Sequence, residues 1–189
     1  AGYLFSFCQG QFTAAPLAGY SLHEQHLRDH HGVQIIDTLN PAQIGPFTGL
    51  HDNYRARWFG PWLGIDLTYQ PMCRLTLLAT FEYHWATYRG SGHWNLRTDF
   101  IRDFKHHSCG HGTVTSIGGL YDICGNWSVG VCFNYKTFRA HHGRDRKFIL
   151  AEFETSSGGV EVLPAYVDSR LNHVAWHSFS AMASVAYNF

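Results

Sequence analysis

The sequence contains little charge and no long apolar run. Charged residues make up 15% of its 189 residues, against roughly 25% in ordinary soluble domains. Its 14 basic and 14 acidic side chains cancel, so the chain lacks the basic field of a nucleic-acid-binding protein, and we expect no nucleic-acid partner. No stretch approaches the ~18 uninterrupted apolar residues of a membrane-spanning helix. Aromatic residues reach 16%, which excludes a disordered chain.

Long stretches of the sequence instead have apolar residues at every second position. The clearest are residues 59–69, 75–87, 127–137 and 179–189. A period of two over such lengths predicts long β-strands with two unlike faces. The joins between strands are too short for crossover connections, so the strands should be antiparallel. We therefore predict one all-β domain over residues 1–189.

The composition of the two faces indicates a barrel that faces lipid. The apolar face of these strands carries no charged residue. The other face is largely Gly, Ser, Thr, Asn and aromatic, and its charged residues are Asp66, Arg74, Glu82 and Lys136. Small uncharged polar side chains suit the interior of a narrow barrel, and the aromatic residues near the strand ends suit interfacial girdles. We predict an up-and-down barrel in the bacterial outer membrane, in contact with lipid and lipopolysaccharide.

The C-terminal strand carries a second indication. Its ending, Tyr187-Asn188-Phe189, resembles the C-terminal signal of Gram-negative outer-membrane proteins, so we expect the barrel-assembly machinery to bind Phe179–Phe189. The chain begins at Ala1 without methionine, as expected if a secretory signal peptide has been removed.

Turn geometry predicts the orientation. An odd-length turn at Gly125 keeps Asp122 off the lipid face. The predicted pairs are Ile123 with Trp127, Tyr121 with Val129, and Ile117 with Phe133. Residues 70–74 make a similar short turn, and short turns are periplasmic in such barrels. Residues 14–52 and 89–108 should then be long extracellular loops.

Six segments are clear strand candidates: 2–13, 54–70, 73–89, 109–124, 127–141 and 173–189. Single-chain barrels usually have at least eight strands. Residues 147–154 and 160–167 would complete eight, which is our prediction, although they could equally form an extracellular hairpin above the membrane. Pro164 suits an edge or a bulge better than a central strand.

Residues 54–189 resemble the C-terminal half of the omptins, the outer-membrane barrel proteases. The matching segments are RWFGPWLGIDLTYQ, LATFEYHWATYRG, SGHWNLRTDF, GTVTSIGGLYD and NWSVGVCFNYK, followed by the closing aromatic strand. The resemblance implies an omptin-like barrel, in which His93 would take the place of the catalytic histidine and Ser91 that of its aspartate partner. Serine cannot supply the charge that orients and stabilises the imidazole of a general base.

Three further groups of residues are candidate sites. Asp66, Glu82, His84 and Lys136 should face the lumen, either as an interior polar network or as an ion path. His106, His107 and His111 are weak metal candidates, but histidine also serves as a polar rim residue, and we expect no metal or other cofactor.

Cys73 and Cys124 fall at the predicted periplasmic turns, where a neighbouring envelope protein could form a disulfide with either. The five cysteines are an odd number, so at least one thiol is free or intermolecular. Cysteine-rich, cross-linked outer envelopes are a feature of chlamydia-like bacteria, and the sequence resembles such proteins in this respect.

Three functions follow as hypotheses. The first is a non-catalytic barrel that stabilises the envelope and presents loops for recognition, as adhesins do. The second is an omptin-like surface protease with an altered site. The third is a small porin-like pore, which a narrow interior filled by side chains disfavours.

Overall fold

The computed structural model describes residues 3–36, 44–46, 48–124, 126–156 and 158–187. Its main feature is a seven-stranded antiparallel sheet in the order β1-β2-β5-β6-β7-β8-β9. The strands are β1 (Phe5–Phe7), β2 (Phe12–Asp29), β5 (Asp52–Met72), β6 (Leu75–His93), β7 (Phe100–Cys124), β8 (Trp127–Glu154) and β9 (Val160–Tyr187). A 3-10 turn, η1 (Cys8–Gly10), follows β1, and β3 (Val33–Gln34) pairs with β4 (Gly45–Pro46). Among the described residues no helix is long and apolar enough to cross a membrane.

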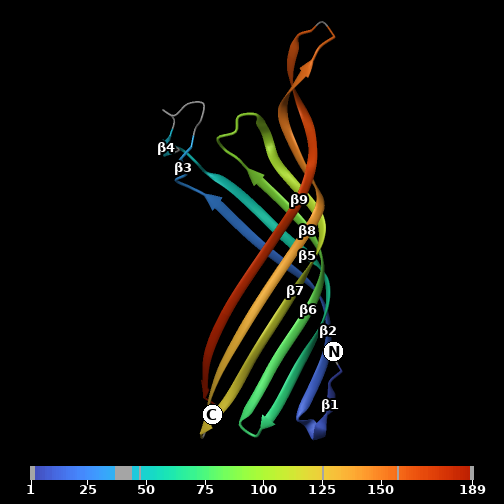
Figure 1. Cartoon of the computed structure of the whole chain (residues 1–189), viewed down its shortest axis with the longest axis vertical. Coiled ribbons are helices and arrows are strands. Elements are labelled where there is room, and N and C mark those ends of the chain that lie inside the picture. Colours follow the sequence, from blue (N-terminus) through green and yellow to red (C-terminus); the bar gives the residue numbers. More distant parts are fainter. Residues whose placement is uncertain (1–2, 37–43, 47, 125, 157, 188–189) are drawn as a thin grey trace.

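The sheet curls about its long axis, with short turns at one end and longer hairpins at the other (Figure 1). The predicted alternation is confirmed: Leu63, Ile117, Val131 and Phe133 lie exposed on the outer face, and the intervening residues face inward. The all-β, antiparallel fold is thus confirmed.

The register at the β7–β8 turn matches the prediction at two of three positions. Tyr121 pairs with Val129, and Ile117 pairs with Phe133. The third prediction was wrong, because the register shifts after Asp122 and Trp127 pairs with Cys124 instead of Ile123. Asp122 still pairs with Ser128 on the inward-facing register, so the irregularity keeps the carboxylate away from lipid. Gly125 itself lies outside the described residues.

Two of the predicted loops are largely strand. β2 extends to Asp29, through the first half of the predicted 14–52 loop, and pairs along its whole length with β5. Its alternation is hard to detect because several of its positions are Ala, Gly or Pro. The predicted 2–13 strand is interrupted by η1. Likewise β6 and β7 extend into the predicted 89–108 loop and leave only residues 94–99 between them.

The eight-strand count is not confirmed. Residues 147–154 and 160–167 are the distal ends of β8 and β9 and pair with each other there. They form a hairpin, which is the alternative to two separate membrane strands. This hairpin rises beyond the other strands in Figure 1. The sheet ends in β9 on one side and in β2, with the short β1 paired to its first residues, on the other. Among the described residues no backbone pairing joins these two sides, so the sheet is not closed.

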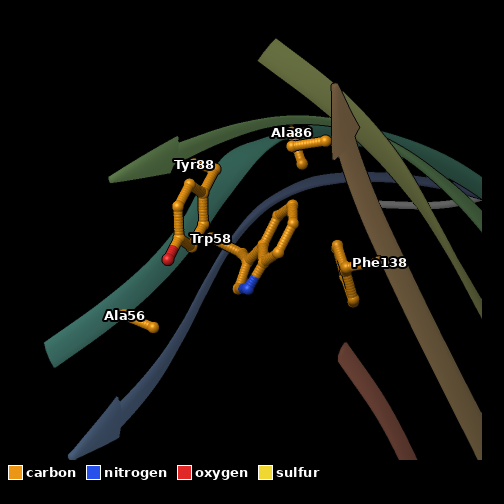
Figure 2. Close-up of a cluster of buried hydrophobic side chains, with 6 residues drawn as sticks. Ala56, Trp58, Ala86, Tyr88 and Phe138 are labelled. Atoms are coloured by element: carbon orange, nitrogen blue, oxygen red, sulfur yellow. The ribbon is translucent and has the colours of Figure 1, made fainter. Parts of the chain in front are cut away.

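The core lies inside the curl, toward the long-hairpin end. Trp58 stands between Tyr88 and Phe138, with Ala56 and Ala86 beside it (Figure 2). β9 contributes partly buried apolar side chains, Leu171, Val174 and Trp176.

Candidate functional site

An aromatic cluster fills the interior of the sheet. Trp58, Tyr88 and Phe138 are each only 1% exposed. The ring of Trp58 lies 4.6 Å from that of Tyr88 and 5.7 Å from that of Phe138, and Phe138 stacks on Trp176 at 5.4 Å. Glycine at position 112 leaves space for the Phe138 ring, since a Cβ there would lie 2.3 Å from that ring. We call Trp58, Tyr88, Phe138 and Trp176 the plug.

His84 is buried beside the plug within a polar network. Its Nδ1 lies 2.9 Å from the Ser21 hydroxyl and its Nε2 lies 2.8 Å from a carboxylate oxygen of Glu82. In the neutral imidazole, Nε2–H donates to the carboxylate and Nδ1 accepts from the hydroxyl. The network therefore joins β2 to β6 across β5.

The other two lumen candidates are placed separately. The Thr80 hydroxyl donates to Asp66 over 2.7 Å, closer to the short-turn end. Lys136 stands opposite Val114 and Ser178 in the sheet. The structure thus joins Glu82 with His84, while Asp66 has a different partner.

His23 falls in the predicted 14–52 loop, but in the structure it belongs to β2 and lies inside the curl. Its ring lies 4.9 Å from Phe138, 5.6 Å from Trp176 and 6.0 Å from His84. Side chains from β2 and β9 therefore meet inside the curl, and the interior is filled from wall to wall at this level.

A basic band lies on the outer face above the aromatic positions. Cross-strand pairing places Arg57, Arg89, His107, Arg144 and Arg170 in one row across five strands. Arg55 and Lys105 lie beside them, along a groove that Arg57 and Arg89 also line. Below Arg139, toward the short turns, the outward-facing residues of the described strands carry no formal charge.

Glu24 is the acidic member of this band. Its carboxylate lies 2.6 Å from Arg55 and 2.8 Å from Arg57, and it also contacts His26. Desolvation would raise the pKa of Glu24, but the hydrogen bonds from Arg55, His26 and Arg57 and the charge of Arg55 lower it to about 2. These residues stand above the uncharged part of the wall, outside the membrane-spanning segment. No sequence signal marks the band, because the strand register brings together residues that are far apart in the chain.

His93 and Ser91 share the outward face of β6. The Nδ1 of His93 lies 3.0 Å from a carboxylate oxygen of Asp103, a residue of β7. Both side chains are more than half exposed, at 52% and 57%. The imidazole thus has a carboxylate partner other than residue 91, and water surrounds the pair.

The three candidate metal ligands do not converge. His106 faces inward, where the Tyr54 hydroxyl donates to its Nδ1 over 2.7 Å. His107 belongs to the basic band on the outer face. His111 stacks on Tyr83 on the same face, with ring centroids 6.2 Å apart. The described residues hold no group of three His, Cys, Asp or Glu side chains arranged for a metal ion.

The two candidate disulfide cysteines lie at the short-turn end. Cys73 is exposed in the β5–β6 turn and its thiol is free. Cys124 ends β7, and its side chain lies outside the described part of the structure. Free thiols are also found at Cys8, Cys109 and Cys132.

Comparison with known proteins agrees with this architecture. The family model for Pom, Protochlamydia outer membrane protein, matches residues 1–189. No curated protein matches the chain. Among solved structures, the chain is similar to the outer membrane protease OmpT from Escherichia coli, with a TM-score of 0.64 and 14% sequence identity. The match covers all of this chain and 61% of the OmpT chain. The predictions of an omptin-like β-barrel fold and of an outer-membrane location are therefore confirmed.

Proposed function

Because the chain belongs to the Protochlamydia outer membrane protein family, we propose that it is a structural barrel of the envelope, non-catalytic and non-conducting, with a surface hairpin for adhesin-like recognition. The observation that carries this proposal is the plug. Trp58, Tyr88, Phe138 and His84 are fully buried inside the curl, so no water-filled path remains at their level. This supports an envelope role over the alternative of a small pore.

Single-channel recording in planar bilayers tests the proposal. The wild-type chain should show no steady conductance. A Trp58→Ala, Phe138→Ala double variant removes two rings from the plug and should conduct. Phe133→Ala is the matched control, because Phe133 faces outward on the same strand as Phe138. Steady conductance of the wild type would overturn the non-conducting role.

The distal β8–β9 hairpin supports the recognition role. Its large exposed apolar side chains are Leu150, Phe153, Val160, Val162, Leu163, Tyr166 and Val167. They lie on both faces of the hairpin, and exposed apolar surface is typical of interaction sites. The hairpin stands beyond the rest of the sheet (Figure 1), which makes it the part of the molecule best placed to contact a partner outside the cell.

The basic band supports contact with lipopolysaccharide. Its guanidinium groups stand just above the uncharged wall, at the depth where anionic headgroups lie, and Arg binds phosphate in a bidentate manner. Arg57→Gln with Arg89→Gln should weaken binding to vesicles that contain lipid A more than binding to phosphatidylcholine vesicles. Arg74→Gln, at the opposite end of the barrel, is the control. Equal loss on both vesicle types would count against this contact.

Proteolysis is the second candidate function, and the His93–Asp103 pair is the observation in its favour. General-base catalysis profits from a site that excludes water, whereas both of these side chains are more than half exposed. We expect the detergent-folded protein with lipopolysaccharide to leave dibasic peptides intact. Cleavage that His93→Ala abolishes would place the protein among the enzymes.

A further inference from the structure

A cavity of about 330 Å³ opens at the mouth of the barrel, above the plug. Its aromatic walls come from β5, β7 and the segment after β6. The ring of Phe104 lies 4.7 Å from that of Trp94 and stacks on Tyr54 at 5.9 Å. Below the cavity the hydroxyl of Tyr54 is hydrogen bonded to that of Tyr88, a member of the plug. The cavity is therefore a pocket with a closed floor.

The charged lining of this cavity holds three carboxylates and one ammonium group, that of Lys147. Asp29 and Asp52 are direct cross-strand partners of β2 and β5, and both line the cavity. Like charges in such a pair repel each other. Asp52 accepts a hydrogen bond from the backbone of Asn95, whereas the Asp29 side chain has no hydrogen-bond or ion-pair partner among the described residues. A cation between the two carboxylates would relieve their repulsion.

A third carboxylate, Asp145, is buried in the wall of the same cavity at 8% exposure. Its Oδ2 is bound by Lys147 at 2.7 Å and by the Ser169 hydroxyl at 2.9 Å. Its Oδ1 lies 3.3 Å from Nε2 of His106, yet accepts no hydrogen bond. Burial lowers the pKa of His106 although the charge of Asp145 opposes this.

We propose that this pocket binds a small organic cation, an alkylammonium whose charge lies between the carboxylates and whose carbon chain lies against the aromatic rings. Aromatic faces attract ammonium groups, and the rings also bury the alkyl part. Lys147 offsets the charge of Asp145, and the carboxylates of Asp29 and Asp52 leave the cavity with an excess of negative charge that disfavours an anionic ligand. The described residues offer no arrangement of three ligands for a metal ion, which favours an organic cation over an inorganic one. This inference is independent of the structural role proposed above.

Titration calorimetry with the detergent-folded chain tests the proposal, with putrescine as the probe and 1,4-butanediol as its uncharged counterpart. Putrescine should bind saturably at one site, and butanediol should give no saturable heat. This comparison needs no variant. Equal binding of the two compounds, or no saturable binding of putrescine, would overturn the proposal.

Variants then locate the site. Asp29→Asn with Asp52→Asn should weaken putrescine binding by at least about tenfold, while the amide introduced at position 52 can still accept the hydrogen bond from the backbone of Asn95. Trp94→Leu keeps an apolar side chain but removes the ring, and should weaken binding by about fivefold. Asp122→Asn removes one negative charge at the far end of the barrel and should leave binding unchanged. Undiminished binding by the folded double Asp variant, checked by heat-modifiable migration, would contradict the assignment of the site.

Discussion

At the scale of single residues, the depth of a position on the barrel wall determines whether it tolerates a charged side chain. Val131 lies exposed on the lipid face of β8, and Val131→Arg should cost ~2–4 kcal/mol of folding free energy if the site lies near the bilayer midplane. Urea titration in lipid vesicles, followed by heat-modifiable migration, measures this cost. Thr87→Arg, on the outward face near the basic band, should cost at most about 1 kcal/mol. Equal costs would show that the wall does not face lipid.

Glu24 gives a residue-scale prediction for pH. Its pKa falls from 4.5 to about 2 on folding, so its ion pairs stabilise the folded state fully above pH 4.5. This contribution is lost as the pH falls toward 2, because the unfolded state then binds the proton more readily. Wild type should therefore be more stable than Glu24→Gln at pH 7, and the difference should shrink between pH 4.5 and pH 2.

Unfolding in urea at several pH values checks this prediction. Glu161→Gln, on the distal hairpin, is the control for loss of a carboxylate elsewhere. A difference between wild type and Glu24→Gln that stays constant down to pH 2 would mean that the ion pairs with Arg55 and Arg57 do not stabilise the fold.

At the scale of elements, the short turns carry a prediction about the cysteines. Cys73 is exposed in the β5–β6 turn, and Cys124 ends β7 at the same end of the sheet. Oxidised envelopes should contain part of this chain in disulfide-linked species through one of these residues. Non-reducing electrophoresis of native membranes should show higher-mass bands that collapse with reductant.

Serine variants show whether the disulfides form at the turn cysteines or elsewhere. Cys73→Ser with Cys124→Ser should abolish the higher-mass bands, while Cys109→Ser, on the β7 wall away from the turns, should leave them in place. Full alkylation of Cys73 and Cys124 without reductant, with a single monomer band, would contradict the prediction.

The elements also show what the sequence could and could not predict. β5, β6 and the wall half of β8 were predictable because bulky apolar residues alternate there with small polar ones, as at Val131 and Gly130. β2 was missed from Ala14 onward because residues such as Ala18 and Gly19 give little contrast between the faces. The plug left a partial signal, since Trp58 and Phe138 are large aromatic residues on the otherwise small, polar face.

The basic band and the cavity at the mouth of the barrel could not be predicted from the alternation of residues along a strand. Arg57, Arg89 and Arg144 become neighbours only through the strand register, and that register depends on a bulge in β8 between Ala140 and Arg144. Similarly, Asp103 reaches His93 from the adjacent strand, a contact that spacing along the chain does not reveal.

At the scale of the whole molecule, the two edges of the sheet limit how it can sit in a membrane. β2 and β9 are long, and no backbone pairing joins them among the described residues. Unpaired backbone groups are not tolerated in hydrocarbon. Direct closure of the six long strands would also fall below the usual minimum of eight. The edges therefore require further strands.

A second copy of the chain could supply them. β2 and β9 run in opposite directions, since each strand in the order β2-β5-β6-β7-β8-β9 is antiparallel to the next. β1 covers the first residues of β2, Phe12–Ala14. Under a two-fold axis along the barrel, β9 of one copy would lie antiparallel to the remaining part of β2 of the other, and both seams would close there. The 189-residue chain refolded by itself in detergent should therefore have the mass of two copies by native mass spectrometry.

Ala183→Pro should lower the dimer fraction, because proline on an edge strand removes a backbone donor, whereas Ala79→Pro on the central strand β6 should prevent folding altogether. A folded, heat-modifiable species with the mass of one chain would show that the edges of a single copy close by another route.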